Sequence, residues 1–82
     1  MSQSEKVVEG LGGIDNIRVI STVGSNERAL GAEVKDPDLV NDTVLKAAGA
    51  ASVGRKDNEI LMDFGLGGPA SIIAQEIRKM LQ

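Results

Sequence analysis

The chain has 82 residues, with nine lysines and arginines against twelve aspartates and glutamates, and it carries a formal net charge of −3. This acidic balance argues against nucleic acid as a partner, because binding to phosphate backbones needs a basic surface. The sequence holds no cysteine and no histidine, which excludes disulfides, thiolate metal sites, thiol nucleophiles and imidazole proton shuttles.

The length indicates one small domain spanning residues 1–82, since a chain of this size can fold alone. No apolar stretch approaches the roughly 20 residues that a membrane helix needs, and the first residues lack the apolar core of a signal peptide. We therefore expect a cytoplasmic monomer that does not span a membrane, although a domain cut from a larger membrane protein would have the same sequence character.

The N-terminal half predicts a short helix followed by two strands. Ser2 and Glu5 have the spacing of a capping box, and Gly12-Gly13 ends the helix. Residues 16–23 and residues 28–35 predict the strands. The residues that alternation assigns to one face of the first strand are Ile17, Val19, Ser21 and Val23. Those that it assigns to the covered face of the second strand are Leu30, Ala32 and Val34.

The C-terminal half predicts a helix, two more strands and a longer helix. Asn41 caps the first of these helices. Residues 50–54 predict a weak strand, residues 55–58 a polar turn with two solvated basic residues, and residues 59–64 a further strand. Pro69 suits the first position of the last helix. The apolar stripe of that helix consists of Ala70, Ile73, Ala74, Ile77 and Leu81.

The order of elements, α-β-β-α-β-β-α, defines the expected fold class. Short connections within each strand pair make the pairs antiparallel. Each helix has one apolar face, so the helices most simply stack on one side of a single sheet. We predict an α+β fold, a two-layer open-faced sandwich in which three helices cover one face of a four-stranded antiparallel sheet.

The loop between the first two strands is the first place to look for a chemical site. Gly24, Ser25 and Arg28 are weak candidates for phosphate binding, because they combine backbone donors, a hydroxyl and a guanidinium. Glu27 beside the arginine weakens this interpretation. A polar hairpin loop with a solvated arginine explains the same residues, and we favour it.

Other polar clusters do not indicate a site. Asp36, Asp38 and Asp42 lack the spacing of a calcium loop and are explained by a turn and a helix cap. The glycine-rich link 65–68 lacks the lysine of a phosphate loop. We expect no metal and no cofactor.

Short stretches spread along nearly the whole chain match, in order, the pattern of a known family. They are Leu11-Gly12-Gly13 with Asn16-Ile17, Glu33-Val34-Lys35-Asp36-Pro37, Leu45-Lys46-Ala47-Ala48-Gly49-Ala50, and Phe64-Gly65 with Pro69-Ala70 and Ile77. In order and spacing they resemble the glucose-type IIB domain of the bacterial sugar phosphotransferase system. The fold of that family agrees with the order of elements predicted above.

The resemblance implies a phosphoryl relay through a cysteine at the end of the first strand. In the family this cysteine takes a phosphoryl group from a IIA partner and passes it to a sugar held by the membrane IIC domain, and a Thr-Arg pair helps to hold the phosphate. Here the cysteine position falls near Asn26 and the pair falls at Arg28 and Ala29, in a segment longer than the family's pattern. The chain contains no cysteine anywhere.

We therefore predict a IIB-like domain without its phosphocysteine, inactive in phosphoryl relay, with a structural, binding or regulatory role. A redesigned or de novo sequence with no biological function fits the same residues. The rival class is an active phosphocarrier that uses a substitute residue in the 24–28 loop, with Ser25 as the candidate. An unrelated small α+β interaction module is a third interpretation. If the chain is natural, the expected partners are IIA-like and IIC-like phosphotransferase proteins or a regulator.

Overall fold

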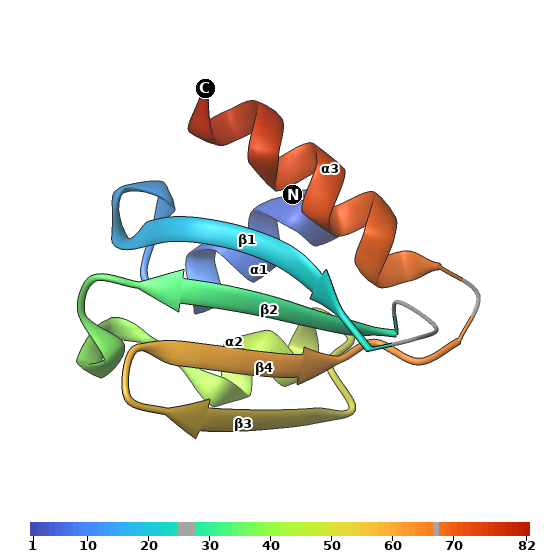
Figure 1. The fold of residues 1–82 in the computed structure, drawn as a ribbon, viewed down its shortest axis with the longest axis horizontal. Helices are drawn as coiled ribbons and strands as arrows, with labels where there is room; N and C mark the ends of the chain where they lie inside the picture. The colour runs from blue at the N-terminus through green and yellow to red at the C-terminus, as the bar shows by residue number, and fades with distance from the viewer. Residues whose placement is uncertain (25–27, 67) are drawn as a thin grey trace.

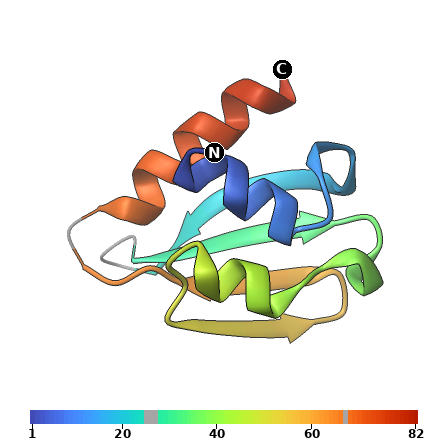
Figure 2. The same ribbon diagram turned by 180° about the vertical axis from the view of Figure 1, so that it is seen from behind.

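The computed structural model describes residues 1–24, 28–66 and 68–82. Its helices and strands, in chain order, are α1 (Gln3–Gly10), β1 (Ile17–Val23), β2 (Ala29–Val34), α2 (Asp42–Ala47), β3 (Ser52–Lys56), β4 (Glu59–Asp63) and α3 (Pro69–Leu81). The strands pair antiparallel in the order β1-β2-β4-β3. All three helices lie on one face of the sheet and leave the other uncovered (Figure 1, and from behind in Figure 2). The predicted α+β open-faced sandwich is confirmed.

Both predicted helix caps are present. The Ser2 hydroxyl accepts the Glu5 N–H at 3.1 Å, and the Glu5 carboxylate accepts the Ser2 N–H at 2.9 Å, which completes the capping box. At α2, the Asn41 side chain accepts the Val44 N–H at 3.2 Å. These bonds satisfy N–H groups that a helix leaves without partners in its first turn, so the short helices begin where the sequence predicts.

The core lies between the sheet and the helices. From α3 it takes the predicted stripe, with Ala70, Ile73, Ala74 and Ile77 buried, whereas Leu81 is only partly buried at the helix end. From the two central strands it takes alternate residues, namely Leu30, Ala32, Val34, Ile60 and Met62. The period-two pattern of β2 and β4 therefore reaches the core as predicted.

β1 departs from simple alternation. Ile17 and Val19 pair with consecutive residues of β2, so Arg18 is an extra residue and forms a β-bulge. Beyond the bulge the alternation is reversed: Ile17 and Ile20 are buried, while Val19 and Val23 are exposed. The prediction that Ile17, Val19 and Val23 share one face is therefore wrong, because one inserted residue turns every later side chain to the opposite face.

β3 occupies residues 52–56 rather than the predicted 50–54. Lys56 pairs with Glu59, so the hairpin turn consists of Asp57 and Asn58 alone. The φ of Asp57 is 56°, a left-handed conformation that short polar residues tolerate. The predicted turn is wrong in its first half, because this tight turn lets the strand continue through both basic residues.

The side chain of Arg55, expected to be solvated, instead joins β3 to the segment before α2. Its guanidinium donates to the carbonyl oxygens of Pro37 and Val40, each at 2.9 Å. Its Nε also donates to Asp42 Oδ1 at 3.2 Å. Arginine suits this position because its planar fork presents several donors at fixed angles.

Asn16 fixes the entry to β1 against the exit from β2. Its Nδ2 donates to the carbonyl oxygens of Leu11 at 2.8 Å and Asp36 at 3.0 Å, and its Oδ1 accepts the Asp36 N–H at 2.9 Å. The side chain is buried. Three hydrogen bonds satisfy this buried amide, so the hairpin that carries the predicted site is held at its base.

Candidate functional site

The predicted phosphate loop lies between β1 and β2. Of its proposed residues, Ser25 and Asn26 lie outside the described residues, and the structure places Gly24 and Arg28. Gly24 has a φ of 94°, a left-handed conformation that favours glycine, and a Cβ added there would meet no atom within 4 Å. The glycine is therefore explained by its backbone conformation alone, as a turn residue.

Arg28 is engaged with a carboxylate. Its Nη2 lies 3.3 Å from Asp63 Oδ2, and its Nε donates to Asp63 Oδ1 at 3.4 Å. Its carbonyl oxygen accepts the Phe64 N–H at 3.0 Å, so the main chain is fixed as well. The pair is half exposed and contributes little to stability. A phosphate group at this arginine would have to compete with Asp63 for the guanidinium.

Asp63 accepts a further hydrogen bond from the main chain. The backbone N–H of Gly65 donates to its Oδ1 at 2.8 Å. This bond, and then the Arg28 guanidinium, hold the pKa of the Asp63 carboxyl below its usual range, because both favour the charged form. The carboxylate thus ties the start of β2 to the link that leads into α3.

Two hydroxyl groups, those of Ser21 and Thr22, lie near the end of β1. Ser21 and Thr22 are half-buried, and neither hydroxyl is hydrogen-bonded to a described side chain. With no histidine in the sequence, the imidazole that commonly activates a serine or threonine hydroxyl is missing.

Residues 1–24, 28–66 and 68–82 lack two other kinds of feature. No group of three His, Cys, Asp or Glu residues is arranged to hold a metal ion. None of the helices has both the length and the apolar character needed to cross a membrane.

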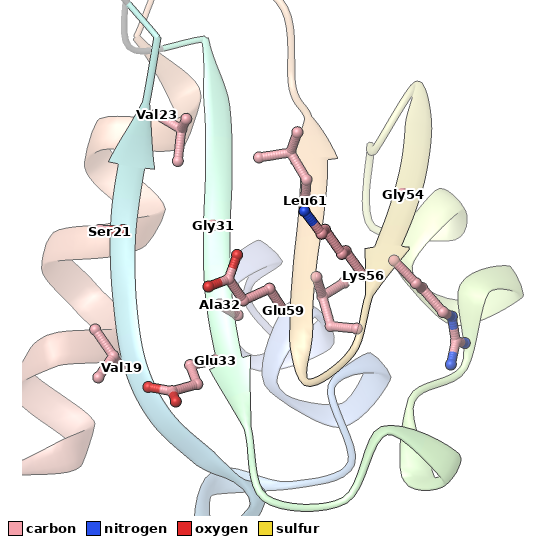
Figure 3. Close-up of a pocket in the computed structure, with 12 residues that line it drawn as sticks. Val19, Ser21, Val23, Gly31, Ala32, Glu33, Gly54, Lys56, Glu59 and Leu61 are labelled. Atoms are coloured by element: carbon pink, nitrogen blue, oxygen red, sulfur yellow. The ribbon is translucent and has the colours of Figure 1, made fainter.

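A hollow of about 570 Å³ lies on the uncovered face of the sheet (Figure 3). It is lined by outward positions of the strands, including Val19, Ser21, Val23, Gly31, Gly54 and Leu61. Sequence reasoning did not predict it. The hollow follows from the strand register, in which Leu61 of β4 pairs with Gly31 of β2 on one side and with Gly54 of β3 on the other. The sequence alone does not place the two glycines on either side of one leucine.

The comparisons with known proteins identify the family. No family model matches the chain. The PTS system N-acetylglucosamine-specific EIIB component of Streptomyces coelicolor is 48% identical over 80 residues, which cover 98% of this chain and 97% of that protein. The crystal structure of one domain of the PTS system IIabc component from Clostridium difficile has the same fold, with a TM-score of 0.73 at 18% identity over 96% of this chain and 78% of that one. The resemblance drawn from short stretches of sequence is thus confirmed, and the chain belongs to the EIIB components of the sugar phosphotransferase system.

Proposed function

We propose that this chain is a non-relaying EIIB protein, which binds phosphotransferase components and does not itself accept a phosphoryl group. The observation that carries the proposal is a contrast within one sequence. The EIIB pattern extends over 80 residues at 48% identity, yet none of the 82 residues is a cysteine.

The chemistry of the relay explains why the missing residue matters. A carrier must form a high-energy phosphoryl bond and release it again, and a thiolate does this well because it is a strong nucleophile near neutral pH. The amide of Asn26, which stands near the cysteine position, has no comparable nucleophilicity. The phosphate-holding pair is altered too, since Arg28 and Ala29 stand in its place and the guanidinium is paired with Asp63.

The retained fold supports a binding role. A protein that keeps an EIIB surface without its nucleophile can occupy the docking site of a IIA-like or IIC-like component without discharging it. The N-acetylglucosamine system is the first place to look for such a partner, because the relative from Streptomyces coelicolor is specific for that sugar. In this proposal the chain acts in the cytoplasm as one monomeric domain over residues 1–82.

The test is phosphorylation followed by intact-mass measurement. The chain is incubated with phosphoenolpyruvate, the general phosphotransferase proteins and a IIA component, with an authentic EIIB as positive control. We expect no phosphoryl gain on this chain. We also expect an excess of the chain to slow phosphorylation of the authentic EIIB, because both compete for IIA. The variant Asn26→Cys, which restores a thiol near the family's position, is the matched gain-of-function control.

The outcomes separate the rival functions. A phosphoryl gain on the native chain that disappears in Ser25→Ala would replace this proposal with a working carrier that uses a substitute residue. Absence of both gain and competition would favour a purely structural role or a redesigned sequence without a partner. Competition without gain supports a regulatory EIIB protein.

A further inference from the structure

The uncovered face of the sheet has an ordered arrangement of side chains. The registers place its outward residues in rows that cross the strands in the order β1, β2, β4, β3, and the row nearest the 24–28 loop holds Val23, Ala29, Asp63 and Ser52. The row nearest the β3–β4 turn holds Val19, Glu33, Glu59 and Lys56. The middle row holds Ser21, Gly31, Leu61 and Gly54. One end of this face is therefore charged, and its middle row is built mainly from residues with little or no side chain.

The middle row makes the hollow. Two of its four residues are glycines and a third is serine, so Leu61 is its one large side chain. A Cβ added at Gly54 would find its nearest neighbour, the Leu61 carbonyl oxygen, at 4.0 Å, and Gly54 has no left-handed backbone that would require glycine. The backbone conformation and the available space thus both permit a side chain at this position, and the hollow results from its absence.

The rim of the hollow is aliphatic. Val19, Val23 and Leu61 are among the large hydrophobic residues that remain exposed, and all three lie on this face (Figure 3). Single exposed aliphatic residues are common on protein surfaces. Here three of them lie around one glycine-floored hollow, so the apolar side chains of this face are gathered at its rim.

The charged row favours a cationic partner. Glu33 and Glu59 stand directly opposite each other on β2 and β4, and like charges in that position destabilise a sheet. Neither carboxylate forms an ion pair with another described residue. Lys56 lies opposite Glu59 on the other side, yet it extends toward Leu61 (Figure 3). A cation from another molecule placed over the two carboxylates would relieve their repulsion.

We propose that this face, defined by Val19, Val23, Gly31, Gly54 and Leu61 with Glu33 and Glu59 at its end, docks a short aliphatic segment of a partner protein that carries a lysine or arginine. The aliphatic side chains fill the glycine-floored hollow, and the cation lies over the two carboxylates. This docking is independent of phosphoryl chemistry in the 24–28 loop and does not rest on the function proposed above.

The charge balance disfavours a second copy of this chain as the occupant. The face carries two glutamates and one lysine in its charged row. Two other charged residues near it are already paired, Arg55 with Asp42 and Asp63 with Arg28. Two such faces brought together would each contribute an excess of negative charge. A basic partner segment instead adds the charge that the face lacks.

The test uses two acetylated pentapeptide amides and the amide NMR spectrum of the full chain. In one peptide three leucines alternate with two lysines, and in the other glutamates replace the lysines. We expect the lysine peptide to shift the amides of Ser21, Gly31, Gly54 and Leu61 in a saturable way. The glutamate peptide should bind at least about fivefold more weakly, as expected for the loss of two exposed ion pairs.

Variants separate the two parts of the proposal. Gly54→Val adds a strand-favouring side chain in open space and should abolish the shifts while leaving the fold intact. The double variant Glu33→Gln/Glu59→Gln should weaken binding of the lysine peptide about fivefold. Glu9→Gln/Asp38→Asn removes two exposed carboxylates elsewhere and is the matched control, for which we expect unchanged binding.

Three results would overturn the proposal. Equal binding of both peptides would mean that the Glu33 and Glu59 carboxylates do not contribute to binding. Shifts that persist in Gly54→Val would place the peptide elsewhere. Concentration-dependent shifts of the same amides without peptide, together with dimers in sedimentation, would make a second copy the occupant.

Discussion

The two faces of the sheet are built from the same strands and have opposite characters. On β4, Met62 is fully buried against the helices, while its neighbour Leu61 points outward with 47% of its surface exposed. On β2, Leu30 and Ala32 enter the core, and Gly31 between them opens the hollow on the other side. One face therefore carries the core, and the other is open to solvent. We therefore expect substitutions in the buried layer to lower the free energy of unfolding far more than substitutions on the open face.

The largest effect is expected where the helix layer meets the sheet. Ile77 is fully buried on α3, whereas Ile72 on the same helix is 60% exposed. Ile77→Ala removes packed methyl groups and leaves a cavity, so it should lower the free energy of unfolding by about 2–5 kcal/mol. Urea unfolding measures the loss.

Ile72→Ala is the matched control for that helix, with the same chemical change at an exposed site. We expect it to change the free energy of unfolding by less than about 0.5 kcal/mol. Similar losses in the two variants would contradict the burial of the stripe of α3.

The next effect concerns the buried amide that holds the hairpin. Asn16→Ala leaves the Leu11 and Asp36 carbonyl groups and the Asp36 N–H without their partner. The expected loss is about 1–3 kcal/mol, because buried and partly buried groups lose their hydrogen bonds. Faster exchange of the amide hydrogens of Lys35 and Asp36, measured by NMR, would locate the damage at the base of the hairpin. A stability unchanged from that of the native chain would mean that water replaces the side chain.

A smaller effect is expected on the open face. Gly54→Val introduces a residue with high strand propensity where the added Cβ meets only a carbonyl oxygen at 4.0 Å. The free energy of unfolding should change by less than about 0.5 kcal/mol or rise slightly. A thermal melt checks this result. A large destabilisation would mean that the open face also contributes to the core, and the contrast between the faces would fail.

The smallest effect is the pH dependence at the exposed Arg28–Asp63 pair. The folded state lowers the pKa of Asp63, chiefly through the Gly65 N–H. The stability that Asp63 contributes is therefore fully present above the pKa that its carboxyl has in the unfolded chain. It is lost as the pH falls through the lower pKa that the carboxyl has in the folded chain. NMR titration should find the carboxyl of Asp63 titrating below the ordinary aspartate range, together with the Gly65 amide shift. Titration at the ordinary value would contradict the hydrogen bond.

Much of the helix layer could be predicted from local signals. The capping box at Ser2 and Glu5, the cap at Asn41 and the stripe of α3 each depend on residues a few positions apart. The bulge at Arg18 and the later start of β3 could not be predicted, because they depend on which residues pair across strands. The local sequence pattern indicates which residues alternate along a strand, whereas pairing with the neighbouring strand determines their register.

The candidate site also has one part that local sequence predicted and one part that depends on contacts between distant residues. Composition and family resemblance directed attention to Gly24, Ser25, Asn26 and Arg28, and their role remains a prediction. The Arg28–Asp63 pair was not foreseen because its residues are 35 positions apart. The hollow was missed for the same reason, since Gly31 and Gly54 come together only through β4.

The bulge at Arg18 has a consequence for sheet growth, because β1 is an edge strand. A regular edge offers a row of free N–H and C=O groups on which strands of other molecules can add, as in cross-β fibrils. The extra residue breaks the spacing of that row, and Arg78 Nε donates to the Ile20 carbonyl oxygen at 3.2 Å, which occupies one of its acceptors. The bulge and this bond thus make β1 a less regular template for strand addition than the β3 edge at Ser52–Lys56, whose pairing with β4 has no register shift.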